Sequence, residues 1–406
     1  MGAITGMASD ITFGGWEAVA LIINAICARI FLNFPREMAE DAGTAGWLET
    51  VYFSILAFLL FYIIARLYAR FNRKDILDIA GLAGGETGRI IGGLLFLGLI
   101  LFAGALILRE YTENMKVISL TDSPLGFVMM FFAVAMVAAC FLGLEPIVRF
   151  IAVSVPIITA GLLFIVLMVA PYYDPTHLLP ALGNGLYGIF GKGFFKLSTY
   201  SPLVYLFLIP PFLKDQKSFR RIGYTALGAS ALLLLISSLA YSLVYSYPTS
   251  LENFLPVFQL ARLINYGRFF QRLESVFVLT FAISAMQYLG VILFFAVHVF
   301  KKTFRLEYHR PIILPFAVIM FSLAFVPSNL MTAIDLETKT YMTFAWSITF
   351  ILPIIILLLA RLRAVPGPLR AQPGGSAPAG GHLPEPPPQG ASGGKRRRWS
   401  KGGGAQ

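Results

Sequence analysis

Long apolar stretches free of acidic and basic residues alternate with short polar segments along most of this chain. Most stretches have the roughly 20 residues that a helix needs to cross a bilayer, and only Glu17 interrupts the first. Backbone groups in lipid must form hydrogen bonds within their own segment, so runs of this length are helical. The pattern predicts an all-α membrane protein with about ten transmembrane helices, at residues 11–28, 50–65, 90–108, 123–144, 150–173, 197–213, 222–251, 275–300, 311–334 and 340–360.

The composition agrees with this pattern and excludes two other classes of protein. Of the 406 residues, 57% are apolar and 13% are charged, and the mean hydropathy is +0.75. A soluble domain carries about a quarter charged residues, so a water-soluble protein could not cover so apolar a chain with polar groups. The two cysteines, Cys27 and Cys140, lie inside apolar stretches, which excludes a secreted fold held by disulfides.

The distribution of charge predicts the domain organisation and the orientation. We expect residues 1–361 to form the transmembrane domain and residues 362–406, rich in glycine, proline and basic residues, to form a disordered tail. The net charge of +11 partly reflects this tail, so it does not indicate binding to nucleic acid. If the N-terminus lies inside, the inner connecting segments carry more lysine and arginine than the outer ones, which predicts that both termini are cytoplasmic. No basic segment precedes the first helix, so we expect it to be retained and not cleaved.

The first and sixth apolar stretches are irregular. The first leads into an Asn-Phe-Pro sequence that ends at Pro35, and the sixth follows a glycine-rich segment and contains Pro202. Proline removes a backbone donor and disturbs the preceding helical turn. The first and sixth of ten helices open the two halves of the chain, so this pattern predicts two inverted five-helix repeats with broken helices 1 and 6 and a binding site between them. A simple kink at each position is the alternative.

The predicted breaks carry the candidate ligand-binding residues. Backbone groups freed by a break can hold the carboxylate and the ammonium group of a free amino acid. The candidates are Asn24, Ala25, Cys27, Ala28 and Arg29 in the first helix and Ser198, Thr199, Tyr200 and Ser201 in the sixth. Alternatively, Arg29 reaches the outer surface or pairs with Glu37 or Glu49, and the hydroxyl groups bond carbonyls freed by Pro202.

Other polar residues in or near the membrane admit two interpretations. Glu17 and Ser284 form a possible ion or proton site, but Glu17 could lie at the membrane interface and Ser284 could bond its own helix. Glu110 and Glu113 are expected to be solvated at the end of the third helix. The alternative is that they form ion pairs or partner contacts together with the residues that open the eighth helix, Arg272 and Glu274.

Residues 253–265 are loosely amphipathic and predict a short helix at the membrane surface, with Asn253 as its N-cap. Such a helix could cover the site, dock a partner or simply connect two membrane helices. The histidines and cysteines show no metal-ligand spacing, and the chain contains no phosphate-binding loop or nucleophile motif. We therefore expect no metal, no cofactor and no enzymatic activity.

Four groups of short motifs, in order along the chain, resemble those of a known membrane protein family. They are residues 30–36 (IFLNFPR) with 42–48 (AGTAGWL), residues 108–113 (LREYTE) with 120–124 (LTDSP), residues 207–214 (FLIPPFLK), and residues 255–262 (LPVFQLAR) with 270–274 (FQRLE). In these motifs the chain resembles the spore germination permeases, the B subunits of nutrient germinant receptors within the amino acid–polyamine–organocation superfamily. The resemblance covers residues 10–361.

This resemblance implies a bundle of two inverted five-helix repeats. It also implies a complex with the A and C subunits of a germinant receptor in the spore inner membrane, where an amino acid or similar nutrient triggers germination. A second hypothesis is a secondary amino-acid transporter, either a symporter or an exchanger, and a third is an ion-conducting channel subunit. The sequence does not separate the three, because one cavity can sense, transport or conduct.

Overall fold

The computed structural model describes residues 12–71, 74–214, 218–264 and 274–363. Within these ranges the chain is helical, and its one β pairing is a single parallel bridge between Phe13 and Leu213. The predicted tail falls almost wholly on residues 364–406, which lie outside the described ranges.

Seven helical segments of the described chain are long and apolar enough to cross a membrane, which confirms the all-α membrane class. The segments that correspond to the predicted first, sixth and ninth crossings are shorter: α1 has 13 residues, α8 has 6 and α12 has 14. Ten crossings in inverted repeats therefore remain a prediction. The seven segments are Phe34–Tyr68, Ile76–Ile118, Leu125–Leu142, Leu144–Met168, Ser218–Val244, Glu274–Thr303 and Leu330–Arg363.

The α-helices and the irregular helical turns between them follow one another closely. In chain order the α-helices are α1 (Gly15–Cys27), α2 (Phe34–Ala42), α3 (Gly46–Tyr68), α4 (Ile76–Ile118), α5 (Leu125–Leu142), α6 (Leu144–Met168), α7 (Gly193–Phe195), α8 (Leu203–Leu208), α9 (Ser218–Val244), α10 (Pro256–Leu263), α11 (Glu274–Thr303), α12 (Arg310–Leu323), α13 (Leu330–Asp335), α14 (Met342–Trp346) and α15 (Leu352–Arg363).

Several helices are longer than their uncharged stretches because ion pairs carry the charges at their ends. Helix α4 begins at Ile76, not at residue 90, with Asp75 and Asp78 forming a reciprocal capping box. Lys302 near the end of α11 donates to both of these carboxylates. Gly85 interrupts α4 with a φ of 67°, a left-handed conformation that glycine adopts without strain.

The predicted spans 311–334 and 340–360 leave residues 335–339 as an outer connecting segment, and this prediction is wrong. Residues Leu336–Tyr341 form a π-helix that joins α13 to α14 without a break in the chain's helical course. Lys339 bonds Asp335 one turn away at 2.8 Å, and the third charged residue, Glu337, is buried. The charges that suggested a loop are thus held within a helical segment.

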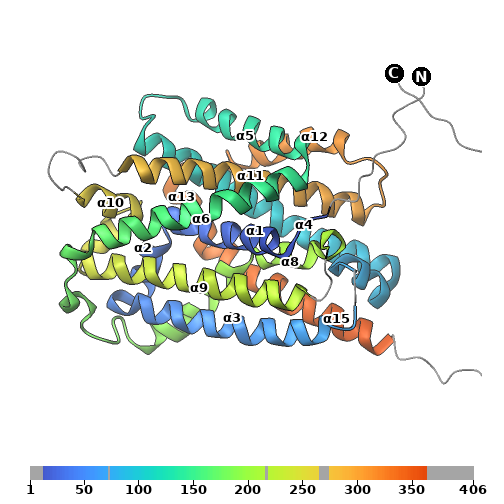
Figure 1. The fold of residues 1–406 in the computed structure, drawn as a ribbon, viewed down its shortest axis with the longest axis horizontal. Helices are drawn as coiled ribbons and strands as arrows, with labels where there is room; N and C mark the ends of the chain where they lie inside the picture. Colours follow the sequence, from blue (N-terminus) through green and yellow to red (C-terminus); the bar gives the residue numbers. More distant parts are fainter. Residues whose placement is uncertain (1–11, 72–73, 215–217, 265–273, 364–406) are drawn as a thin grey trace, which may run out of the picture. The chain divides into compact units, whose positions relative to one another are not determined.

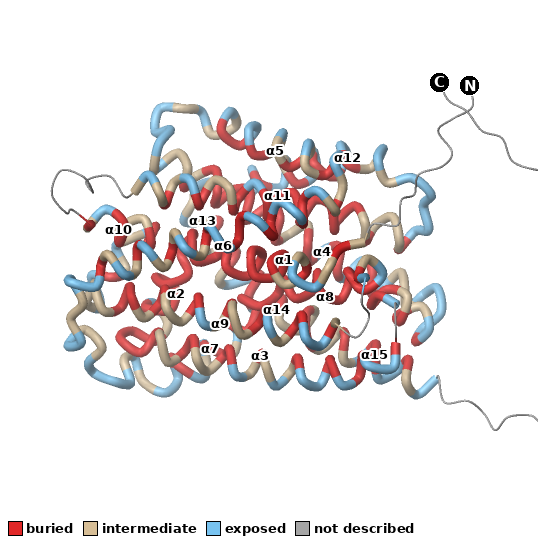
Figure 2. The backbone as a smooth tube through the Cα atoms, in the orientation of Figure 1, coloured by how far each residue is buried: buried red, intermediate tan, exposed pale blue. Residues whose placement is uncertain are grey.

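The broken segments lie at the centre of the bundle. Figure 1 shows α1 and α8 between a group formed by α3, α9 and α15 and a group formed by α5, α11 and α12. Helix α1 packs against α6 and α9, and α11 packs against α4, α5 and α6. Burial is concentrated in this central region (Figure 2), where every residue from Leu197 to Ile209 is buried.

The predicted surface helix exists as α10, and it is shorter than expected. Its N-cap position is Leu255, so the prediction that Asn253 caps it is wrong. The Asn253 amide instead donates to the hydroxyl group of Tyr241 at 3.2 Å. Pro256 occupies the first helical position, where its missing N–H costs nothing, and this sets the start of the helix.

Close packing of α9 on α3 gives a test of this arrangement. A Cβ atom at Gly223 would overlap the fully buried ring of Phe61, whereas a Cβ at Gly228 would lie 3.8 Å from Phe58. We predict that Gly223→Val lowers the stability of the purified protein by about 1–3 kcal/mol through overpacking. Gly228→Val on the same helix is the control, and thermal unfolding in detergent is the measurement. Equal midpoints for the two variants would contradict the packing.

Candidate functional site

The first break lies directly after α1. The α-helix ends at Cys27, and residues Ala28–Phe31 continue as a 3-10 helix. At Leu32 the backbone leaves helical geometry, with φ −93° and ψ −124°, before α2 begins with a proline in its first turn. The Tyr111 hydroxyl group from α4 donates to the carbonyl oxygen of Ala28 at 3.4 Å. Side chains of a neighbouring helix thus bond backbone that the break leaves free.

The second break lies before α8. A π-helix at Tyr187–Lys192 leads through α7 into a 3-10 helix at Lys196–Tyr200, and Pro202 then precedes α8. The change from one helical winding to another within so few residues leaves backbone groups without their usual partners.

The four consecutive hydroxyl groups at the second break have different surroundings. Ser198 donates to the carbonyl oxygen of Met342 at 2.6 Å and accepts from the N–H of Trp346 at 2.9 Å. The Tyr200 hydroxyl lies 2.8 Å from that of Ser54, and Ser201 lies 2.6 Å from the Tyr341 hydroxyl. Thr199 is buried, and its hydroxyl has no partner among the described residues. Ser198 therefore ties the break to α14, and Ser201 ties it to the π-helix before α14.

A small cavity lies between the two breaks. Its volume is about 10 Å³, which is room for about one water molecule. Side chains of both broken segments line it together with α4, α11 and the π-helix at Leu336–Tyr341. The lining residues are Arg29, Ala103, Leu106, Ile107, Ser201, Pro202, Tyr288, Glu337 and Tyr341. A second cavity of similar size shares Ala103, Ser201, Pro202, Tyr288 and Tyr341.

A chain of buried ion pairs starts at this cavity. Arg29 lies 2.7 Å from a carboxylate oxygen of Glu337 and 3.3 Å from one of Glu37. Glu37 also accepts from Lys196 at 3.0 Å, and Lys196 lies 3.1 Å from Asp41. These contacts join the first break, α2, the second break and the π-helix, so charged side chains connect elements far apart in the sequence.

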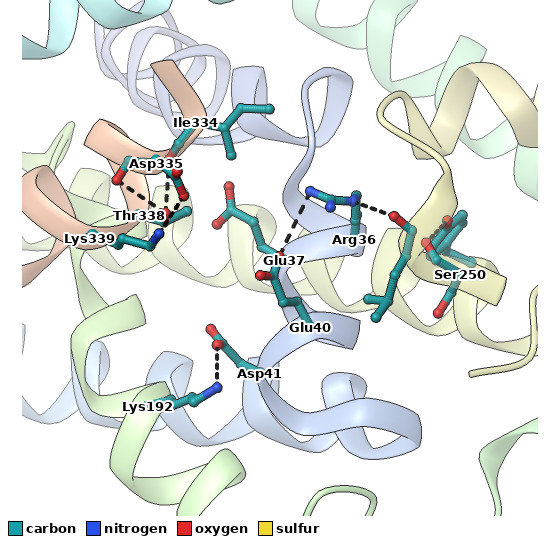
Figure 3. A network of polar contacts seen from close by, with 12 residues as sticks. Arg36, Glu37, Glu40, Asp41, Lys192, Ser250, Ile334, Asp335, Thr338 and Lys339 are labelled. Atoms are coloured by element: carbon teal, nitrogen blue, oxygen red, sulfur yellow. Dashed lines mark hydrogen bonds and ion pairs between the residues drawn. The ribbon is translucent and has the colours of Figure 1, made fainter. Parts of the chain in front are cut away.

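The outer part of this chain of ion pairs is visible in Figure 3. Asp41 faces Lys192, with 3.3 Å between the charged atoms, while Asp335 faces Lys339 on the neighbouring helical segment. Arg36 donates to the backbone carbonyl of Leu251 at 2.8 Å and lies 3.8 Å from the carboxylate of Glu40. Arg36 and Glu37 therefore serve different contacts, and only Glu37 pairs with the cavity-lining Arg29.

The structure brings some of the candidate ligand-binding residues together and separates others. Arg29 and Ser201 line the cavity, whereas the remaining candidates are absent from its lining. Asn24 accepts from Ser284 at 3.3 Å, and Cys27 faces Ser230. Ala25 and Ala28 are buried in the core of the bundle. Glu17 is half-buried in the first turn of α1, on a different turn from the Asn24–Ser284 contact.

Two alternatives for individual charges are settled by these contacts. Arg29 is 6% exposed and does not reach the surface, and it pairs with Glu37 and not with Glu49. The expectation that Glu110 is solvated is wrong, because its side chain is only 1% exposed. Helix α4 continues past Glu110 to Ile118, so this residue lies within the helix and not at its end. Glu113 pairs with Arg109 at 2.9 Å, and the proposed partner Arg272 lies outside the described residues.

Sequence reasoning missed Glu337, Tyr341 and Tyr288. Glu337 falls between two predicted spans, where a connecting segment is expected, and both tyrosines lie in stretches that have the pattern of ordinary apolar helices. The sequence gives one signal for Glu337. Arg29 is a positive charge at the end of an apolar stretch and needs an acidic partner, and Glu337 is the distant acid that supplies one.

Comparison with known proteins identifies relatives over most of the chain. Residues 15–333 match a family described as Spore germination protein. Spore germination protein YndE of Bacillus subtilis (strain 168) is 24% identical over 357 residues, which cover 86% of this chain and 96% of that protein. Spore germination protein KB of the same organism is 23% identical over 253 residues, covering 60% of this chain and 66% of that protein.

Solved transporter structures share the fold at low sequence identity. Mhp1, a nucleobase-cation-symport-1 family transporter, has a TM-score of 0.58 and 12% identity, covering 82% of this chain and 76% of Mhp1. A Na+-coupled sialic acid symporter has a TM-score of 0.59 and 11% identity, covering 88% and 82%. A manganese transporter of Eremococcus coleocola has a TM-score of 0.56 and 12% identity, covering 89% and 78%. The structure is therefore transporter-like.

The ion pairs of Arg29 predict a large effect on stability. Arg29→Met leaves the carboxylates of Glu37 and Glu337 without their guanidinium partner in a buried site, and we expect a loss of about 3–5 kcal/mol. The double variant Arg29→Met with Glu337→Gln should lose less than the sum of the two single losses, because one uncompensated charge is removed.

The control is Arg149→Met, which breaks the exposed pair of Arg149 with Glu145 and should change stability by less than about 1 kcal/mol. Thermal unfolding of the purified wild type and the four variants gives the comparison. Strict additivity between Arg29 and Glu337 would show that the buried pair does not exist.

Proposed function

Because the chain belongs to the spore germination permease family, we propose that it is the membrane subunit of a germinant receptor, which binds a small zwitterionic nutrient such as an amino acid. Binding occurs at the cavity between the two helix breaks and triggers germination. The buried ion pair between Arg29 and Glu337, which lines this cavity, is the observation that carries the proposal.

This ion pair is complementary to an amino acid. A free amino acid carries a carboxylate and an ammonium group on neighbouring atoms, and each needs a partner of opposite charge when it leaves water. The nutrient can insert between the two side chains, with its carboxylate on the Arg29 guanidinium and its ammonium group on the Glu337 carboxylate. Both protein charges keep a partner throughout, since Arg29 also holds Glu37.

Backbone groups and hydroxyls at the breaks supply the remaining contacts. Asn24, Ala25, Cys27 and Ala28 belong to the turns before and at the first break, and Ser198–Ser201 form the second. Among Ser198–Ser201, only the Thr199 hydroxyl has no partner among the described residues. Thr199 does not line the closed cavity, so in this proposal its hydroxyl reaches the ligand only after the second break moves. The Ser201–Tyr341 contact closes the cavity and would open for the ligand. In this proposal an accompanying cation or proton binds either at Glu17, in the first turn of α1, or at the Asn24–Ser284 pair about two turns further along.

The size of the cavity implies a conformational change. Ligand sites for small molecules have volumes of roughly 300–1,000 Å³, whereas this cavity holds about 10 Å³. The structure therefore corresponds to a closed form, in which the lining elements must separate before an amino acid can enter. We propose that this separation moves α10 and the π-helix at Leu336–Tyr341, and that these movements transmit the signal to the partner subunits.

The family also suggests the setting of this subunit. We propose that it assembles with the A and C subunits of a germinant receptor in the spore inner membrane. Ten crossings in two inverted repeats, with both termini cytoplasmic, agree with the excess of basic residues in the inner connecting segments.

A secondary amino-acid transporter is the second candidate function. The likeness to solved symporters favours it, because the same fold moves substrates in those proteins. Flux measurements in proteoliposomes distinguish the two functions. Saturable, ion-coupled uptake of an amino acid by the chain alone would favour transport, whereas binding without uptake would favour sensing.

The Glu337 carboxylate gives a direct test of the ligand site. We predict that Glu337→Gln raises the amino-acid concentration needed for half-maximal germination by about 10- to 100-fold, the effect of losing one charged hydrogen bond. The matched control is Asp335→Asn, which removes an exposed carboxylate two residues away. Spores with equal amounts of each variant are scored for loss of refractility across a panel of amino acids. A Glu337→Gln strain with wild-type sensitivity would contradict the proposed site.

A further inference from the structure

A second carboxyl group lies against Glu337. Glu110 on α4 is 1% exposed, Glu337 is 2% exposed, and their carboxyl groups lie within hydrogen-bonding reach of each other. Helix α4 packs directly on the π-helix that carries Glu337. One oxygen of each carboxyl group, Oε1 of Glu110 and Oε2 of Glu337, has no partner among the described residues.

This contact has a direct chemical consequence. An ionised carboxylate only accepts hydrogen bonds, so two carboxyl groups can bond each other only when one of them carries a proton. Like charges this close cannot both be ionised without a large cost in a buried site. We propose that Glu110 and Glu337 form a proton-binding site, in which the two carboxyl groups share one proton beside the cavity.

The surrounding charges support a single bound proton. The three cations of this chain of ion pairs, Arg29, Lys196 and Lys192, are balanced by the three carboxylates of Glu37, Glu337 and Asp41. Glu110 is then a surplus negative charge. Its neighbour in sequence, Arg109, cannot neutralise it, because that guanidinium bonds two backbone carbonyls and Glu113 instead. A proton on Glu110 therefore makes the cluster neutral.

The geometry also selects a proton over a metal cation. The guanidinium of Arg29 already occupies one side of the Glu337 carboxylate at 2.7 Å, so a second full positive charge would be repelled there. Because Arg29 stabilises the ionised form of Glu337, the proton resides on Glu110 and donates to Glu337.

The titratable and charged groups that face the pair come from six elements. They are Arg29 from the first break, Glu37 from α2, Lys196 from the second break, Tyr341 from the π-helix at Leu336–Tyr341, Tyr288 from α11 and Tyr111 from α4 itself. Tyr341 and Tyr288 line the cavity. Since Glu337 also lines the cavity, the proton can exchange with solvent when the cavity opens.

Infrared spectroscopy of the purified full-length protein without any nutrient tests this site, so the result does not depend on the proposed function. The wild type at neutral pH should show a carbonyl stretch from a protonated carboxyl group that is sensitive to deuterium exchange. Glu110→Gln should lose the part of this band that belongs to the pair, whereas a contribution from Glu49, a second buried carboxyl group on α3, should remain. The control Glu113→Gln, on the same helix and in a half-exposed ion pair, should retain it.

A second variant makes the test independent of how well Glu110→Gln folds. In Glu337→Gln the charge balance leaves Glu110 as the partner of Arg29, so Glu110 should ionise and the same part of the band should be lost. If either variant folds and its spectrum in this region equals that of the wild type, Glu110 is ionised in the native protein and the proposal is overturned.

Discussion

The buried guanidinium of Arg29 is the constraint on which the centre of this protein depends. A charge inside a bilayer costs about 3 kcal/mol on insertion scales, and more when it has no partner. Here Glu37 and Glu337 approach it from elements far apart in the sequence, one from the helix that follows the first break and one from the π-helix at Leu336–Tyr341. The packing of these elements therefore depends on the Arg29 charge, and the burial of that charge depends on the two carboxylates that the packing brings to it.

Contacts from neighbouring elements explain why the broken segments can persist within the bundle. Unwound backbone is tolerated at membrane depth only where protein covers it. Tyr111 reaches the first break, and Ser198 joins the second break to Met342 and Trp346. The hydroxyl groups that sequence reasoning placed in a ligand site thus serve in part to hold the breaks together, and Ser201 with Tyr341 closes the cavity between them. In the proposed receptor, these few polar contacts would keep the site closed until the ligand arrives.

The proposed proton-binding pair and the proposed ligand site share Glu337, so one residue would link the two sites. Arrival of an ammonium group at Glu337 would replace the hydrogen bond from Glu110, so occupancy of the cavity and protonation of α4 are linked through one carboxylate. Two sites that bias one element are coupled reciprocally. In the proposed receptor, binding of the nutrient would thus change the charge at the centre of the membrane domain.

Much of the architecture is determined by the sequence alone. The apolar stretches establish the helical membrane class because bilayer thickness sets a minimum length, and the prolines indicate the two breaks because proline cannot complete a helical ladder. The pairing of Arg29 with Glu37 could also be predicted from the sequence, because the two residues are only eight apart. The burial of Glu110, the helical course of residues 335–339 and the pairing of Glu337 with Arg29 were decided by tertiary structure. Those charges look like loop or surface residues in a one-dimensional pattern, and only packing against distant partners makes their burial favourable.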